Sequence, residues 1–149
     1  MNSKRFNIRV YGLITHPEKG LLISEERYQG RHFTKFPGGG LEWGEGPEDA
    51  VKRELREELD LQVASVEHFY TTDFFVQSAF NENDQVVSIY YKIKPLNGEL
   101  LEEVEERENT EEPGRTQTFH WVTLEELSME SVRFATDRRV VDLIMRSGL

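Results

Sequence analysis

Apolar residues along the chain gather in short segments that are separated by turn-forming residues. The segments rich in β-branched or aromatic residues, which are typical of strands, are 5–14, 20–25, 31–36, 63–76, 85–94 and 116–123. The sequences THPEK and NENDQ supply turns between neighbouring segments. This pattern predicts a protein built largely of strands.

Two further segments have the properties of helices. Residues 47–59 are good helix formers, and Pro47 marks the start because its missing N–H is not needed in the first turn. A last helix is predicted from Thr136 to Arg146, with Thr136 as N-cap and Gly148 just past the end. The sequence TLEEL at 123–127 is predicted to form one helical turn.

The predicted helix 47–59 has three distinct faces when its residues are placed 100° apart. The apolar stripe, predicted to face the core, consists of Val51, Leu55 and Leu59. A stripe of mixed charge, predicted to be solvated, consists of Asp49, Lys52, Arg53, Arg56 and Asp60. The third arc carries only acidic charge and consists of Glu54, Glu57 and Glu58.

The overall composition indicates a globular protein and limits its partners. The 149 residues favour a single domain spanning 1–149, and the 28 acidic against 18 basic residues give a net charge of −10. This charge disfavours binding to nucleic acid backbones, and an anionic substrate would need a metal ion to invert the local charge. No apolar run is long enough to cross a membrane and no secretory signal is visible, so we expect a cytoplasmic protein. The absence of cysteine excludes disulfides and thiolate chemistry.

The three glutamates of the acidic arc need an explanation because like charges at these spacings repel one another. Each such pair costs about 0.2–0.5 kcal/mol on an exposed helix. A divalent cation would remove this cost, since Mg²⁺ is bound by carboxylates and water. For three helical glutamates alone, an acidic surface helix is the simpler interpretation. The glycines at 38–40 favour the metal interpretation, because glycine lets the backbone approach a metal or phosphate closely.

At this point the sequence resembles the Nudix hydrolase family, whose motif is G-x5-E-x7-R-E-U-x-E-E-x-G-U, with U a bulky aliphatic residue. Residues 39–61, called the box below, match every position of the motif except one. The exception is Asp60, which stands where the family has a glycine that ends the helix. Aspartate tolerates the left-handed conformation better than most residues, so we expect a small effect on stability and little on chemistry.

The resemblance implies an α/β (α+β) fold in which a mixed β-sheet lies between helices, an α/β/α sandwich. It also implies a Mg²⁺-dependent pyrophosphohydrolase, with Mn²⁺ as an alternative metal, acting on a nucleoside diphosphate joined to a further moiety. By position, the metal ligands are Glu54, Glu57, Glu58 and the carbonyl of Gly39. Arg53 would orient the carboxylates by pairing with Glu57 or Glu45. Many members of the family form homodimers, which is the only reason to expect one here.

The general base that accepts the proton of the attacking water stays open between several residues. Glu54 or Glu57 in the box could serve, and so could Glu111 or Glu112. The last two belong to a glutamate-rich segment, 97–116, whose simplest interpretation is a solvated loop.

The substrate also stays open, because marks of individual subgroups are absent outside the box. Aromatic candidates for stacking on a base are Phe36, Trp43, Phe74, Phe75, Phe80, Tyr90 and Tyr91, with Trp43 of most interest because it lies in the box loop. Candidate phosphate contacts are Arg27, Arg31 and Lys35, although surface roles explain them equally well. The alternative function is a Nudix-fold module that binds a nucleotide ligand without hydrolysing it.

Overall fold

A computed structural model describes residues 3–96, 107–108 and 112–149 of the chain. The strands are β1 (Arg5–His16), β2 (Gly20–Tyr28), β3 (Arg31–Lys35), β4 (Gly38–Gly40), β5 (Val63–Thr71), β6 (Asp84–Pro95), β7 (Arg107–Glu108) and β8 (Thr116–Val122). The helices are α1 (Pro47–Leu59), α2 (Ala135–Ser147) and the short 3₁₀ helix η2 (Met129–Ser131). Most of the acidic segment 97–116, including Glu111, lies outside the described residues.

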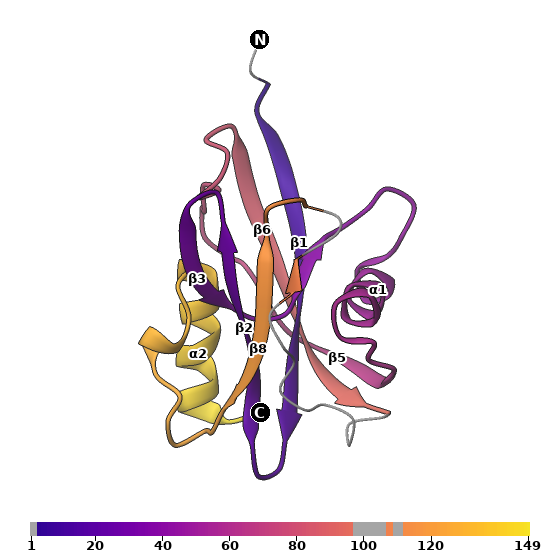
Figure 1. Ribbon diagram of the computed structural model, residues 1–149, viewed down its shortest axis with the longest axis vertical. Helices are drawn as coiled ribbons and strands as arrows, with labels where there is room; N and C mark the ends of the chain where they lie inside the picture. Colours follow the sequence, from indigo (N-terminus) through magenta and orange to yellow (C-terminus); the bar gives the residue numbers. More distant parts are fainter. Residues whose placement is uncertain (1–2, 97–106, 109–111) are drawn as a thin grey trace.

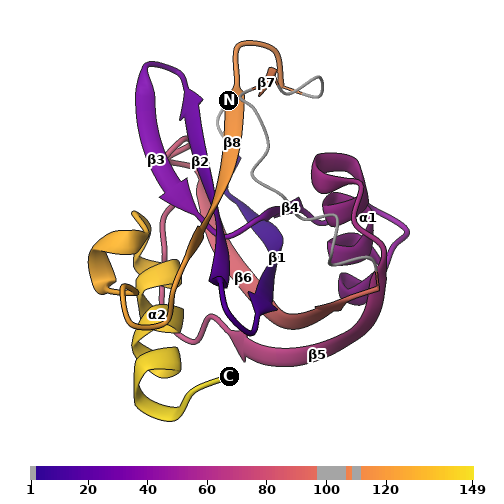
Figure 2. The same cartoon turned by 60° about the horizontal axis from the view of Figure 1, so that its bottom comes forward.

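The described strands form one mixed sheet that is covered by a helix on each side (Figure 1). Its order is β5-β6-β1-β2-β8-β7, with β3 paired to β2 and β4 paired to β1. Strands β1 and β6 run parallel, while the other pairs are antiparallel. Helix α1 lies on one side and α2 on the other, as the second view also shows (Figure 2). The predicted mixed sheet between helices is therefore confirmed.

The sheet divides into two halves because β1 pairs with β2 only at the tip of their hairpin, at Thr15↔Leu21 and His16↔Gly20. One half contains β4, β1, β6 and β5, and the other contains β3, β2, β8 and β7. The halves diverge from the hairpin, so polar residues of both can face one another away from its tip.

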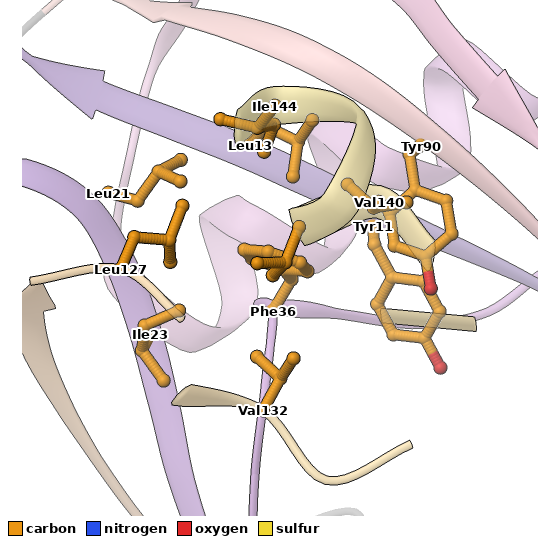
Figure 3. Packing of buried hydrophobic residues seen from close by; sticks show 11 residues of the cluster. Tyr11, Leu13, Leu21, Ile23, Phe36, Tyr90, Leu127, Val132, Val140 and Ile144 are labelled. Carbon is orange, nitrogen blue, oxygen red and sulfur yellow. The ribbon is translucent and has the colours of Figure 1, made fainter. Parts of the chain in front are cut away.

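Strand alternation sends side chains of β1 to two separate cores. Val10 and Ile14 pack with residues of α1, whereas Tyr11 and Leu13 pack with residues of α2. In the second core Phe36 lies at the centre, between the strands and α2 (Figure 3). Strand β1 is thus the central layer of the sandwich, which explains its continuous buried run from Val10 to Ile14.

Several predicted boundaries are wrong, and each error has a physical cause. The strand predicted over 63–76 ends at Thr71, and Phe74 and Phe75 remain 40% and 71% exposed because no core covers them there. Phe134, not Thr136, is the N-cap residue of α2, and Thr136 lies buried in the first turn. By contrast, the sequence TLEEL forms the predicted single turn, in which the N–H groups of Glu126 and Leu127 both donate to the carbonyl of Thr123.

Helix α1 has the predicted bounds and ends in the expected way. Val51 and Leu55 are fully buried, and Leu59 packs partly against the same core. Asp60 adopts the left-handed conformation with φ 54° and ψ 32°. Its N–H donates to the carbonyl of Arg56, and the next N–H donates back to Leu55, which closes the helix. Neither α1 nor any other described helix has the length and apolar character needed to cross a bilayer.

Candidate active site

The site begins where β4 presents its backbone to the inner face of α1. Gly39 pairs with Val10 of β1, and a Cβ atom at Gly39 would lie 2.5 Å from Glu54 Oε1. A larger residue at Gly39 would displace the Glu54 carboxylate, because real Cβ contacts are essentially never so short. The sequence did not predict that the glycines form a strand, since their pairing depends on β1. The pairing brings a carboxylate of the helix against the peptide backbone of the box.

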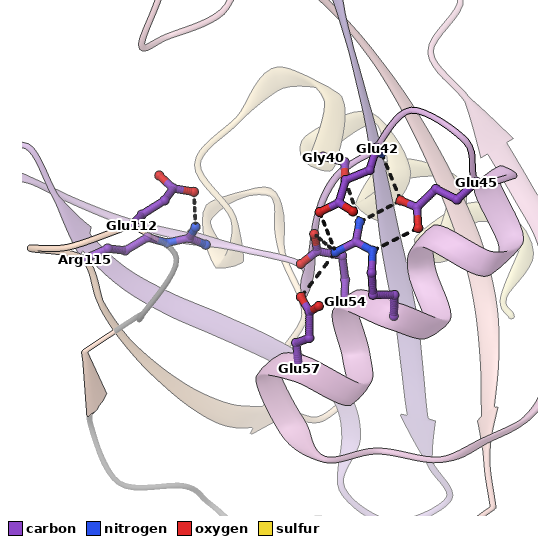
Figure 4. A network of polar contacts seen from close by, with 8 residues as sticks. Gly40, Glu42, Glu45, Glu54, Glu57, Glu112 and Arg115 are labelled. Atoms are coloured by element: carbon purple, nitrogen blue, oxygen red, sulfur yellow. Dashed lines mark hydrogen bonds and ion pairs between the residues drawn. The ribbon is translucent and has the colours of Figure 1, made fainter.

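Arg53 is the centre of the polar network that joins the box loop to α1 (Figure 4). Its Nε and Nη2 donate to the two oxygens of Glu45 at 2.9 and 2.7 Å, and Nη2 also donates to the carbonyl of Gly40. Its Nη1 donates to Glu54 at 3.0 Å and Glu57 at 3.2 Å. The prediction that Arg53 belongs to a solvated face is wrong, because these contacts leave its side chain 13% exposed. Both predicted pairings, with Glu45 and with Glu57, are present.

The charges of this network are fixed by its hydrogen bonds. Donation from Arg53, together with the backbone at Glu42, lowers the pKa of Glu45 to about 2. The same contact with Glu45, and the charge of Glu54, raise the pKa of the Arg53 guanidinium. Glu45 therefore stays an anion at every ordinary pH and holds the guanidinium in one orientation.

Glu58 differs from the other box glutamates because it points into the protein. Its Oε2 atom is buried and has no hydrogen-bond partner among the described residues. Burial, with the charges of Glu54 and Glu26, raises the pKa of Glu58 to about 7, although Lys35 and Arg115 act in the opposite direction. Burial also raises the pKa of Glu54. A buried, unpartnered carboxylate oxygen costs free energy unless a cation or donor binds it.

The donor set of the box fits a hard divalent cation in its chemistry. Glu54 and Glu58 are acidic oxygen donors, Glu54 lies against the backbone of Gly39, and Glu58 has an oxygen that no other described residue binds. Within the described residues, no three acidic or histidine side chains are gathered closely enough to hold a metal as they stand. Arg53 Nη1 donates to both Glu57 and one oxygen of Glu54 and so holds these two side chains near one another.

A second, buried network lies behind the box and centres on Glu26 of β2. Lys35 lies 3.0 Å from Glu26 Oε2, and Ser24 and Gln117 donate to the same oxygen. Arg115 donates from Nε to Oε1 at 2.6 Å, and its Nη2 lies 2.5 Å away as an ion-pair contact. Burial alone would raise the pKa of Glu26, but Lys35 and Arg115 more than offset this and lower it. The surface role considered for Lys35 is wrong, since this residue is 4% exposed.

A cavity of about 360 Å³ is lined by residues of the Glu26 network. It approaches the box at Arg9, whose Nη1 lies 3.8 Å from the point where a Cβ atom of Gly40 would be. Four aromatic rings line one side in mutual contact: Tyr28, Phe33, Phe80 and Phe134. Among the predicted stacking residues, only Phe80 lines this cavity. Trp43 is fully exposed, while Phe36, Tyr90 and Tyr91 belong to the cores. Sequence reasoning missed the other three rings because they come from separate elements that meet only in the fold.

Cationic and acidic side chains also line the cavity. They are Arg5, Arg9, Lys35, Arg115, Glu26, Asp84 and Glu112. Glu112, one of the predicted base candidates, accepts a hydrogen bond from Arg115 at 2.8 Å and lies across from the Arg53 network (Figure 4). Arg9 was missed by sequence reasoning, because nothing in the sequence places the middle of the first strand beside the box.

The sequence profile of the NUDIX domain matches residues 5–144 of the chain. The chain belongs to the Nudix family. The Nudix fold is also found in solved structures that cover nearly all of it. The MutT protein from Methanosarcina mazei Go1 has a TM-score of 0.68 at 18% identity, covering 96% of this chain and 95% of that one. A MutT NUDIX hydrolase from Burkholderia pseudomallei has a TM-score of 0.67 at 19% identity, covering 93% and 98%.

Relatives with named activities resemble shorter parts of this Nudix chain. An RNA pyrophosphohydrolase of Saccharophagus degradans is 41% identical over 56 residues, which are 38% of this chain and 33% of that protein. An 8-oxo-dGTP diphosphatase of Haemophilus influenzae is 36% identical over 70 residues, covering 45% and 52%. The chain thus spans about a third to a half of the length of these relatives.

Proposed function

We propose that this Nudix protein is a Mg²⁺- or Mn²⁺-dependent hydrolase that cleaves the pyrophosphate bond of a nucleoside diphosphate derivative. Nucleoside triphosphates and nucleotide sugars are such derivatives. The observation that carries the proposal is the unpartnered, buried oxygen of Glu58, one helical turn from Glu54, whose carboxylate lies against Gly39. The arginine and the acidic residues of the box are all present. In a helix with only a structural role, a buried carboxylate oxygen without a hydrogen-bond partner would cost free energy and serve no purpose.

Each box residue has a role that follows from its contacts. Glu54, Glu57, Glu58 and the carbonyl of Gly39 would hold the metal ion. When bound, the metal neutralises the pyrophosphate, polarises its P–O bond and acidifies water. Glu45 fixes Arg53, and Arg53 in turn fixes Glu54 and Glu57, so that the carboxylates are aligned before the substrate arrives.

The proton of the attacking water requires a carboxylate, and three described residues are candidates. Glu54 and Glu57 lie within the box, where Arg53 holds both. Glu112 lines the cavity with a side chain that is 43% exposed, and its bond to Arg115 keeps it oriented. Comparing the glutamine variants of all three by their pH–rate profiles would identify the base, because its loss removes the acidic limb.

The cavity supports a free nucleotide as the substrate. Its aromatic side offers rings on which a base can stack, and its charged side leads toward the box. An RNA chain would have to leave the cavity and cross a protein with a net charge of −10, which repels a polyanion. We therefore favour a mononucleotide derivative over the end of an RNA. Action in the cytoplasm fits such a substrate and is part of the proposal.

A panel assay with matched variants tests this function. Purified protein is incubated with Mg²⁺ and nucleoside triphosphates, nucleotide sugars, ADP-ribose, dinucleoside polyphosphates and a 5′-triphosphorylated RNA, and the products are separated by chromatography. Glu58→Gln should abolish turnover, since it removes a predicted metal ligand. Glu48→Gln, an exposed residue in the first turn of the same helix, should leave turnover unchanged.

The possible outcomes separate the two functions considered. Turnover of one class that requires Mg²⁺ and is lost in Glu58→Gln supports the hydrolase and names the substrate. Turnover of the RNA alone would contradict a mononucleotide substrate. Binding of a nucleotide without turnover would favour a ligand-binding module. Turnover that survives in Glu58→Gln would overturn the proposed metal site.

A further inference from the structure

Arg9 differs from the other cations that line the cavity because it has no carboxylate partner among the described residues. Its Nε donates to the hydroxyl of Tyr11 at 2.8 Å, and its guanidinium carbon lies 5.8 Å from the centre of that ring. No ion pair within 4.0 Å involves Arg9 in the described part of the chain. The fork formed by its two terminal nitrogens is therefore held in place from one side and available on the other.

The neighbouring cations of the cavity are all neutralised by a specific carboxylate. Arg5 lies 2.7 Å from Asp84, and Lys35 lies 3.0 Å from Glu26. Arg115 contacts both Glu26 and Glu112. A cation left over in such a setting points to an anion that the protein itself does not supply.

The position of Arg9 places this charge between the cavity and the box. Arg9 lines the cavity, and its Nη1 lies 3.8 Å from the point where a Cβ atom of Gly40 would be. Tyr11 first, and then the charges of Glu54 and Glu112, raise the pKa of the Arg9 guanidinium against the opposing effect of burial. The charges of Glu54 and Glu112 therefore act on Arg9, although neither carboxylate forms an ion pair with it. Arg9 is positioned to contact a ligand that extends from the cavity to the box.

The strand beside Arg9 carries a second polar group without a partner. Ser88 on β6 is the register partner of Arg9 on β1 and also lines the cavity. Its Oγ atom is buried and forms no hydrogen bond with any described residue. Two neighbouring residues on one sheet face therefore have hydrogen-bonding capacity that the described protein leaves unused.

We propose that Arg9 binds the substrate phosphate that links the cavity-bound nucleoside to the metal-bound end of the molecule. The inference rests on the proposed function, and it assigns a role to a residue outside the box. A phosphate offers the paired oxygens that match a guanidinium fork. Since the nucleoside lies in the cavity, this phosphate is the one attached directly to it.

Binding of reaction-product analogues tests this assignment without any metal or hydrolysis. The four ribonucleoside 5′-monophosphates and the four free nucleosides are titrated in EDTA into wild type and Arg9→Ala, with calorimetric detection. We expect Arg9→Ala to weaken binding of the preferred monophosphate about 10- to 100-fold, the range of a charge-assisted hydrogen bond. Binding of the corresponding nucleoside should change less than about twofold, because it has no phosphate to lose.

Two further variants separate a phosphate contact from a general effect of charge or packing. Arg9→Lys should bind the monophosphate with intermediate affinity, because the ammonium keeps the charge and loses the fork. Arg146→Ala removes one positive charge from an exposed position of α2 outside the cavity lining and should leave the affinity unchanged. Thermal unfolding of each variant shows whether it is folded.

The binding results that would overturn the role of Arg9 differ from those that would overturn the proposed hydrolase. Equal weakening of monophosphate and nucleoside in Arg9→Ala would overturn the assignment, as would unchanged binding of both. It would also fall if wild type bound none of the monophosphates at millimolar concentration. Mg²⁺-dependent turnover that is lost in Glu58→Gln would then still support the hydrolase. Conversely, monophosphate binding that depends on Arg9, without turnover of any substrate, would support the assignment and leave a binding module.

Discussion

The networks around Arg53 and Glu26 are built from the same types of residue and have opposite charge balance. Arg53 is one cation among four carboxylates, since Glu42 lies 3.6 Å away in addition to Glu45, Glu54 and Glu57. Glu26 is one anion between two cations, Lys35 and Arg115, with two neutral donors. The first network is open to solvent at Glu42 and Glu57, whereas the second is buried throughout.

This difference separates the proposed metal site from a network that holds strands together. In the buried network each charged group has an oppositely charged partner, and the network connects β2, β3 and β8 at one place. The box network has an excess of negative charge, which a divalent cation would neutralise. An unbalanced cluster on a rigid helix is thus a better indication of function than a perturbed pKa alone, because structural ion pairs also shift pKa values.

The largest effect on stability is expected from Glu26→Gln. The variant keeps the shape of the side chain, leaves Lys35 buried without its anion and leaves Arg115 with only the partly exposed Glu112. This should lower the free energy of unfolding by about 3–5 kcal/mol. Urea unfolding followed by circular dichroism measures this loss. Adding Lys35→Met should recover part of it, because the buried cation without a partner is then removed.

Glu57→Gln is the matched comparison for that variant. Glu57 is 35% exposed and paired at i, i+4, so its loss should change stability by about 0.5 kcal/mol or less. Hydrolysis should nevertheless be lost, because Glu57 is a proposed metal ligand.

For the Glu26→Gln variant, a loss of stability below about 1 kcal/mol would contradict the structural role of the buried network.

Arg53→Lys should affect activity more than stability. A lysine keeps the charge but cannot bind both oxygens of Glu45 while also reaching Glu54 and Glu57. We expect kcat/KM to fall about 10- to 100-fold, as for other groups that orient metal ligands. The Mg²⁺ concentration at half-maximal rate should rise as well, which a purely structural role would not cause.

Glu42→Gln is the control for this variant. Glu42 is 64% exposed and lies at the edge of the same network, so its loss should change kcat/KM less than about twofold. Full activity of Arg53→Lys at low Mg²⁺ would show that the carboxylates are aligned without the arginine.

The sequence predicted those features that depend on local pattern. Helix α1 has its predicted bounds because Pro47 starts it and the left-handed Asp60 ends it. The strand predicted over 63–76 was too long because β propensity at Phe74 and Phe75 was not supported by burial. Thr136 resembles an N-cap locally. In the structure, however, the helix already begins at Ala135, and packing buries Thr136 within the first turn. Where packing and propensity disagree, packing determines the boundary.

The difference between local pattern and tertiary packing also decides which residues of the site could be predicted. The box residues could be predicted because their spacing on one helix brings them together. Arg9, Ser88 and the ring of Phe134 could not, since β1, β6 and the start of α2 meet only through the topology of the sheet. Arg53 could be predicted only in part. Its partners were predicted from the box, whereas its burial depends on Gly40 and the folded loop.

The stability provided by Glu26 should depend on pH in a defined direction. Its pKa is lowered in the folded protein from an ordinary value of 4.5, so its contribution is complete above about pH 4.5. The contribution is lost as the pH falls through the folded-state pKa. The difference in unfolding free energy between wild type and Glu26→Gln should therefore narrow below about pH 4.5. A difference that stays constant down to pH 3 would show that the charge of Glu26 is not what stabilises the network.

The smallest effect is expected at Asp60, which ends the helix that carries the box network. Asp60→Gly should raise the free energy of unfolding by about 0.5–1 kcal/mol, because glycine removes the cost of a left-handed backbone. Gln29 is the other described non-glycine residue with positive φ, at 51°, and lies outside the box in the β2–β3 turn, at the lining of the cavity. Gln29→Gly should therefore stabilise the protein similarly. If only Gln29→Gly does so, the Asp60 side chain itself contributes to ending the helix. A change in kcat/KM that is confined to Asp60→Gly would show that the end of α1 helps to position the carboxylates, which the network around Arg53 is expected to do alone.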